Sequence, residues 1–147
     1  MNVRALAGSV GIAALALTAC GSKAPTPLSQ ADWVSQGNAI CADSHTKAQA
    51  IPQTNALSQV APNLAASVQI FNDALNKLAA LTPPAAYAAD TATYIADLRT
   101  ESTALSAAAT QAKTDPKGAL AALETLSKSA VQDDALATKI GLTTCAN

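Results

Sequence analysis

Few residues in this chain are of the types that usually carry out chemistry, and two of them are spaced one helical turn apart. Cys41 and the single histidine, His45, could form a thiol–imidazole pair. Asp133 and Asp134 form the only acidic doublet, but neighbouring residues on a helix do not face one another. The sequence contains no nucleophile elbow, phosphate-binding loop or dinucleotide motif. We therefore predict that the chain has no enzyme activity, catalytic residue, cofactor or metal site. We expect His45 to be a surface or packed residue and the acidic doublet to be exposed to solvent.

The N-terminal segment has the order of a secretory signal. Arg4 precedes an apolar stretch at 5–16, which is shorter than the about 20 residues that a membrane-spanning helix needs. The segment ends in Leu17-Thr18-Ala19-Cys20, which resembles the lipobox of bacterial lipoproteins, where the cysteine becomes the first mature residue and carries lipid. This pattern predicts a signal peptide at 1–19, palmitate-type lipidation of Cys20, and an anchor on the extracytoplasmic face of the cell membrane. The alternative is an ordinary signal peptide with an incidental cysteine.

Two cysteines, Cys41 and Cys145, remain if Cys20 is lipidated. An even number of thiols normally pairs in an oxidising compartment. We predict a disulfide that closes a loop of about 105 residues and stabilises the fold by up to about 4–5 kcal/mol. The alternative is a metal or redox site, but redox cysteines are usually two residues apart and zinc prefers four ligands. Only His45 could join the two thiols.

The composition explains why such a crosslink would matter. Half of the 147 residues are hydrophobic, but 37 of these are alanine, which buries little apolar surface. The remaining aliphatic and aromatic residues are close to the minimum with which a chain can form a core. Nine basic and ten acidic residues give a net charge of -1. Because the cations are scattered singly, we do not expect nucleic acid as a partner.

Breaker residues and helical spacing predict a single all-α domain at 29–147, after a proline-containing tether at 20–28. Caps, prolines and a terminal glycine predict four helices. The first covers about 29–51, and the second runs from Pro62 to just before Pro83. The third covers about 84–113, and the fourth runs from Asp115-Pro116 to Gly141. Short connections favour an antiparallel, up-down-up-down four-helix bundle. Alanines at many facing positions allow the helices to approach closely, so we expect little room for a ligand.

Apolar residues at helical spacing predict which face of each helix enters the core. The most regular stripe belongs to the second helix and consists of Leu64, Val68, Phe71, Leu75 and Leu78. The predicted inner faces of the others are Trp33, Gly37, Ile40, Cys41 and Ser44 in the first helix; Tyr87, Thr91, Tyr94 or Ile95, Leu98 and Leu105 in the third; and Leu120, Leu123, Leu126 or Ser127, Ala130, Ala137 and Ile140 in the fourth.

The two cysteine-containing ends of the domain carry a family resemblance. Trp33-x-x-x-Gly37-Asn38-x-Ile40-Cys41 lies near the mature start, Pro83-Pro84 breaks the middle of the chain, and Gly141-Leu142-x-x-Cys145 closes it. With the lipobox, this pattern resembles small actinobacterial lipoproteins of the mycobacterial type, whose function is uncharacterised. The resemblance implies an envelope lipoprotein with a disulfide-closed helical fold. It implies no activity and no catalytic residues.

Two functions fit these observations. The first is a non-enzymatic, lipid-anchored protein that binds or scaffolds an envelope protein partner at the outer face of the membrane. The second is a carrier of a small molecule or lipid, with a cavity between the helices near Trp33. Trp33, Tyr87 and Tyr94 are the candidate ligand-binding residues, because bundle interiors can host apolar ligands. A large aromatic such as Trp33 is also typical of a core that otherwise holds small residues.

Overall fold

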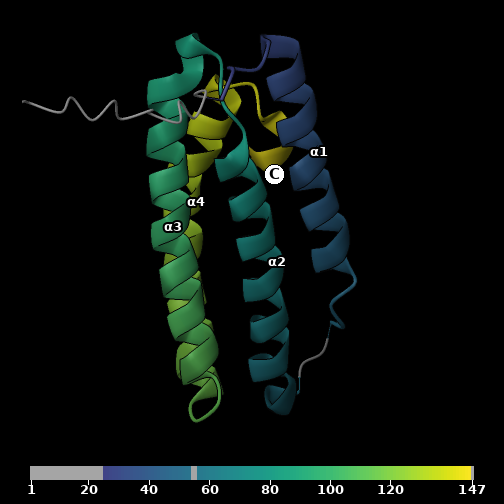
Figure 1. The fold of residues 1–147 in the computed structure, drawn as a ribbon. Helices are drawn as coiled ribbons and strands as arrows, with labels where there is room; N and C mark the ends of the chain where they lie inside the picture. The colour runs from purple at the N-terminus through teal and green to yellow at the C-terminus, as the bar shows by residue number, and fades with distance from the viewer. Residues whose placement is uncertain (1–24, 54–55, 147) are drawn as a thin grey trace, which may run out of the picture.

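The computed structural model describes residues 25–53 and 56–146, which form an up-down-up-down bundle of four helices (Figure 1). The helices are α1 (Gln30–Gln49), α2 (Val60–Ala80), α3 (Ala88–Gln111) and α4 (Pro116–Lys139), with 3₁₀ turns η1 (Leu57–Gln59), η2 (Ala85–Tyr87) and η3 (Thr143–Ala146). The described ranges contain no strand, so the predicted all-α bundle is confirmed. The predicted signal peptide and Cys20 lie outside the described residues.

The ends of the helices follow the capping residues in the sequence. The Ser29 hydroxyl accepts a hydrogen bond from the backbone N–H of Asp32 at 3.1 Å, and α1 begins there. Asp115 accepts from the backbone N–H of Gly118 at 2.9 Å, and this bond lowers the pKa of the Asp115 carboxyl. Gly141 has a φ of 83°, the left-handed conformation that lets the chain turn back after α4.

Two boundaries differ from the predicted ones. The third helix begins later than expected, because Pro84 is extended and the residues after it form η2 before α3 starts. The tether ends earlier than expected, because Leu28 is half-buried against the core and its backbone N–H donates to the Thr82 carbonyl at 2.9 Å. Leu28 therefore belongs to the folded domain.

The bundle has two separate cores. The upper core lies where α1 begins and α4 ends; it consists of Trp33, Cys41, Leu75, Leu78, Tyr94, Ile95, Leu98, Ala137, Ile140 and Leu142. The lower core lies at the opposite end of the bundle and consists of Leu64, Ala109, Ala112 and Ala119. Its buried residues come from α2, α3, the C-cap Ala112 of α3, and α4, and none of them comes from α1.

The inner faces of α1, α2 and α3 are largely those that the spacing predicts. The prediction for Leu120 on α4 is wrong, because this side chain is 42% exposed while its neighbour Ala119 is fully buried. The start of α4 thus presents the smaller side chain to the lower core. This orientation brings the helices together through Ala109, Ala112 and Ala119, as expected for an alanine-rich interface.

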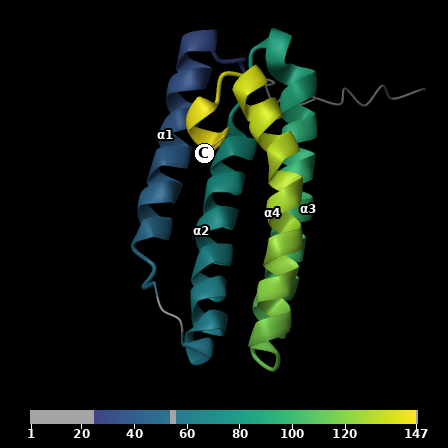
Figure 2. The ribbon, with the colours of Figure 1, turned by 180° about the vertical axis from the view of Figure 1, so that it is seen from behind.

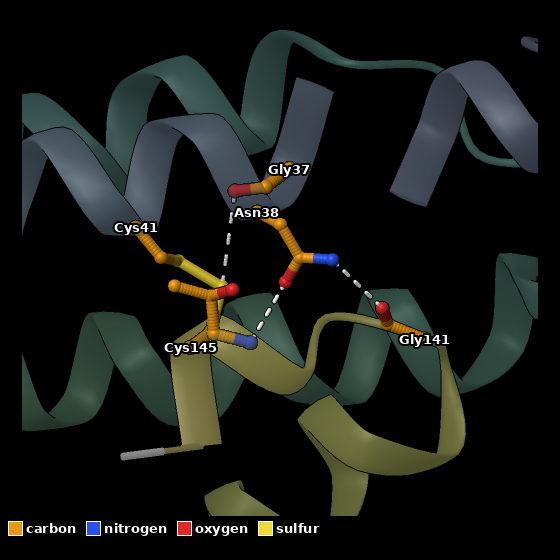
Figure 3. Close-up of a disulfide and its surroundings, with 6 residues drawn as sticks. Gly37, Asn38, Cys41, Gly141 and Cys145 are labelled. Carbon is orange, nitrogen blue, oxygen red and sulfur yellow. Dashed lines mark hydrogen bonds between the residues drawn. A yellow bond between two sulfur atoms is a disulfide. The ribbon is translucent and has the colours of Figure 1, made fainter. Parts of the chain in front are cut away.

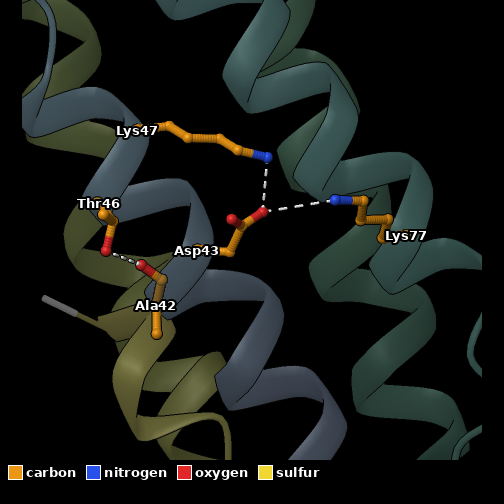
Figure 4. A network of polar contacts seen from close by, with 5 residues as sticks. All are labelled: Ala42, Asp43, Thr46, Lys47 and Lys77. Atoms are coloured by element: carbon orange, nitrogen blue, oxygen red, sulfur yellow. Dashed lines mark hydrogen bonds and ion pairs between the residues drawn. The ribbon is translucent and has the colours of Figure 1, made fainter.

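An ion-pair network joins the outer surfaces of α1 and α2 (Figure 4). One carboxylate oxygen of Asp43 accepts from Lys47 on the same helix at 2.8 Å and from Lys77 on α2 at 3.5 Å. The hydrogen bond from Lys47 is the main cause that lowers the pKa of Asp43. All three side chains are about half exposed, so solvent screens the network and it orients the helices more than it stabilises them. None of the helices in the described ranges is both long and apolar enough to span a bilayer.

Candidate functional site

A disulfide fixes the C-terminal turn η3 to the middle of α1. Cys41 and Cys145 are bonded, with their Cα atoms 5.2 Å apart, although the two residues are 104 positions apart in the sequence (Figure 3). The predicted crosslink is confirmed, and Cys41 therefore has no free thiolate for a reaction with His45. Because η3 packs against both α1 and α4, it lies between these two helices in the upper half of the bundle (Figure 2).

Polar contacts beside the disulfide hold the same turn in place. The Asn38 side chain donates to the Gly141 carbonyl at 3.1 Å, and its oxygen accepts from the backbone N–H of Thr144 at 2.8 Å. Gly37 faces Leu142 so closely that an added Cβ would overlap a methyl carbon of that side chain. Gly37 and Asn38 of α1 thus contact Leu142 and Gly141 of the C-terminal turn, and these contacts hold the C-terminal segment against the domain.

A cavity of about 360 Å³ lies beside the disulfide, and its wall extends from residues of the upper core to Leu105, which packs against the lower core. All four helices and η3 contribute to its wall: the lining residues are Cys41, Ser44, His45 and Ala48 from α1; Ser67, Ile70, Phe71 and Leu78 from α2; Tyr94, Leu98, Glu101 and Leu105 from α3; Asp133 and Asp134 from α4; and Cys145. The wall is mainly apolar, with carboxyl groups on the side formed by α3 and α4.

The cavity corrects the expectation that close helix packing leaves little room for a ligand. That expectation assumed four helices in mutual contact along their length. In the structure, η3 lies between α1 and α4 (Figure 2). The cavity beside it is lined by residues of all four helices. The two cysteines of the disulfide therefore border this space.

The acidic wall contains three carboxyl groups, those of Glu101, Asp133 and Asp134. Asp133 is only 7% exposed. Burial is the main cause that raises the pKa of Asp133; the charges of Asp97 and Asp134 act in the same direction, and Glu101 on α3 acts in the opposite one. The neutral form of the Asp133 carboxyl is therefore favoured more than it is in water.

Tyr94 lies in the upper core and lines the same cavity. Burial, followed by the nearby charges of Asp133, Glu101 and Asp134, raises the pKa of Tyr94 to about 12. Its hydroxyl group is therefore neutral throughout the physiological range and can act as a hydrogen-bond donor or acceptor.

The structure places the three candidate ligand-binding residues differently. Tyr94 lines the cavity, as predicted. Trp33 is fully buried outside the lining, and its indole N–H donates to the Ile140 carbonyl at 2.9 Å, so it is a core residue. Tyr87 also lies outside the lining, and its hydroxyl accepts from the Gln30 side chain at the surface. The cavity therefore lies elsewhere than the predicted site near Trp33.

Three residues that the sequence placed outside any site line this cavity: His45, Asp133 and Asp134. His45 is half-buried in the cavity wall, in keeping with the packed alternative. The prediction of a solvent-exposed acidic doublet is wrong for Asp133, which is buried, and right for Asp134, which is exposed at the cavity edge. The turn of about 100° between helix neighbours separates their environments. Glu101 is the residue that sequence reasoning missed, because Asp133, which lines the same cavity, lies on another helix.

Comparison with protein-family profiles, curated proteins and solved structures finds no match to this chain. The interpretation of the site therefore rests on its own geometry. Within the described ranges, no group of three or more His, Cys, Asp or Glu side chains is arranged to hold a metal ion. A concave, mainly apolar wall with a few polar groups is the usual form of a small-molecule site.

The substitution Asp133→Asn is expected to stabilise the domain at neutral pH. The pKa of Asp133 is raised above its ordinary value of 3.8, so the folded state binds this proton more tightly than the unfolded state does. Stability of the wild type should then fall as pH rises from 3.8 to the raised pKa, and an amide that cannot ionise avoids this loss. Urea unfolding at a series of pH values will measure the difference. If the stability difference between Asp133→Asn and the wild type does not grow as the pH rises above 3.8, the pKa of Asp133 is not raised in the folded state.

Proposed function

We propose that this chain is a lipid-anchored protein of the cell envelope whose helical domain binds a small, largely apolar molecule in the cavity between its helices. The cavity is the observation that carries the proposal. At about 360 Å³ it falls within the usual range of roughly 300–1,000 Å³ for small-molecule sites. Among the two functions that fit the sequence, this observation favours the carrier over a scaffold. An envelope protein partner stays a prediction.

The proposed role is non-enzymatic. The side chains in the wall with the greatest chemical reactivity are the two cysteines, and their sulfur atoms are joined to each other. The disulfide and the Asn38 contacts fix η3, so the upper edge of the cavity is already formed in the absence of a ligand. A preformed site spends little binding energy on ordering the protein, which suits a protein that holds a ligand and releases it unchanged.

The anchor supports a role at the membrane, where apolar molecules are concentrated. It rests on the lipobox-like sequence that ends in Cys20 and on the resemblance to actinobacterial lipoproteins. Several acyl chains at one residue give stable attachment, unlike a single short chain. The substitution Cys20→Ser should move the protein from the membrane fraction to the soluble extracytoplasmic fraction. If the variant sediments with membranes as the wild type does, the anchoring proposal is wrong.

The substitution Ser44→Phe tests the ligand site. Ser44 is half-buried in the wall on α1, so a phenyl group there should occupy part of the cavity. We expect the affinity for N-phenylnaphthylamine, a neutral dye that fluoresces in apolar surroundings, to fall by about tenfold or more. The titration uses the mature chain with Cys20→Ser, so that no covalent lipid competes with the dye.

The matched control is Ala39→Phe, which adds the same ring to an exposed position of α1 outside the lining. This variant should bind the dye as the parent chain does. Equal affinity of Ser44→Phe and the parent chain, or no saturable binding by the parent chain, would count against the proposed function. Circular dichroism of the three proteins verifies that each retains its helices.

A further inference from the structure

We propose that the cavity selects amphipathic organic cations, that is, molecules with an apolar body and an amine or quaternary ammonium group. This inference rests on the proposed function and specifies the class of ligand. It follows from how charge and apolar surface are distributed over the lining residues. The apolar part of the wall comes from Ile70, Phe71, Leu78, Leu98 and Leu105. The polar part is dominated by the carboxyl groups of Glu101, Asp133 and Asp134.

The titratable groups around the cavity have one predominant sign. No lysine or arginine is among the lining residues. His45 on α1 is the single basic side chain in the wall, and α2 and η3 contribute no charged group to it. The acids come from α3 and α4, and Asp97 adds a further negative charge beside Asp133. An anionic ligand would meet several carboxyl groups in a wall that holds no lysine or arginine, whereas a cation would be attracted.

The neighbouring carboxyls give the cation a specific position. Glu101 on α3 and Asp133 on α4 line the same side of the cavity. An ammonium group placed there can donate charge-assisted hydrogen bonds to these carboxylates, and such bonds are stronger than those between neutral groups. Asp134, exposed at the edge of the cavity, adds attraction at the entrance.

The positions of the carboxyl and apolar groups also predict how a ligand is oriented in the cavity. The two neighbouring carboxyl groups lie on the wall formed by α3 and α4, whereas Ile70 and Phe71 lie on α2. A ligand that places its charged end at Asp133 can therefore lay its apolar part against α2 and the lower part of α3. Burying the apolar part supplies affinity, and the carboxyl groups discriminate between ligands of the same size.

The test compares three ligands that share a ten-carbon chain, each competing with N-phenylnaphthylamine below its micelle-forming concentration. The protein is the mature chain with Cys20→Ser. At neutral pH, decylamine should displace the dye at a concentration about tenfold or more below that of decanol or decanoate. The substitutions Asp134→Asn and Asp133→Asn should each reduce this preference several-fold. Because Asp134 is exposed, its substitution leaves the fold intact and keeps the test decisive.

Asp73→Asn is the charge-matched control, since Asp73 is exposed on α2 and lies outside the lining. It should leave the preference for decylamine unchanged. The inference is overturned if the three ligands compete equally, if decanoate is preferred, or if Asp73→Asn has the same effect as the two cavity variants. If dye and decanol bind without a preference for the amine, the inference alone fails. If the wild-type cavity binds neither dye nor decanol, the proposed function fails with it.

Discussion

Removing the disulfide through the paired substitution Cys41→Ala and Cys145→Ala will lower the free energy of unfolding by about 2–5 kcal/mol. The crosslink joins residues 104 positions apart, so it restricts nearly the whole domain in the unfolded state. Such a loss is a large part of the about 5–15 kcal/mol that stabilises a typical domain. Urea unfolding followed by helical circular dichroism measures the change.

Reduction of the wild-type disulfide provides the control, because it breaks the same crosslink without altering any side-chain volume. The reduced wild type and the double variant should unfold at similar urea concentrations. A difference between oxidised and reduced protein of less than about 1 kcal/mol would mean that the cores alone support the fold. In that case the alanine-rich composition would be a weaker constraint than we infer.

Replacing Trp33 with alanine will cost about 3–5 kcal/mol, comparable with the loss of the disulfide. The side chain is fully buried and fills the upper core between α1 and the end of α4. Its removal leaves a large cavity in the upper core, whose other residues are already packed against one another, and it leaves the Ile140 carbonyl without the indole donor. Thermal unfolding under oxidising conditions measures this loss, because the wild type and the variant then both keep the disulfide.

The substitution Trp33→Phe separates the two contributions. A phenyl ring retains part of the apolar contact but cannot donate to Ile140, so this variant should fall between the wild type and Trp33→Ala. Dye binding should persist in Trp33→Phe, because Trp33 does not line the cavity. A loss of dye affinity in a folded Trp33→Phe protein would place Trp33 in the ligand site after all.

The sequence was sufficient for the architecture because local signals and packing agree. Ser29, Asp115-Pro116 and Gly141 mark the helix ends in the positions where the structure has them. The stripe from Leu64 to Leu78 faces the core as its spacing requires. The cysteine pairing followed from the number of thiols and the predicted compartment. Each of these inferences depends on residues close together in sequence or on a choice among few partners.

The site could not be predicted in the same way, because it depends on how helices meet. The cavity arises where η3 separates α1 from α4, and no local pattern encodes that separation. Glu101 and Asp133 are 32 positions apart, and only the register between α3 and α4 brings both into the same cavity wall. For Trp33 the sequence allowed both a core role and a ligand-binding role, because size and aromaticity are suited to both. Its full burial and its hydrogen bond to the Ile140 carbonyl assign it to the core.

The central claim is that the cavity beside the disulfide holds a ligand, and chemical-shift mapping tests it most directly. Amide resonances of the mature chain with Cys20→Ser would be recorded during a titration with decylamine. We predict saturable shifts concentrated at the lining residues of all four helices, including Ser44, Phe71, Glu101 and Asp133. Residues of the lower core such as Ala119 should shift little. Shifts confined to the outer surface, or no saturable shift at the lining residues, would contradict the account.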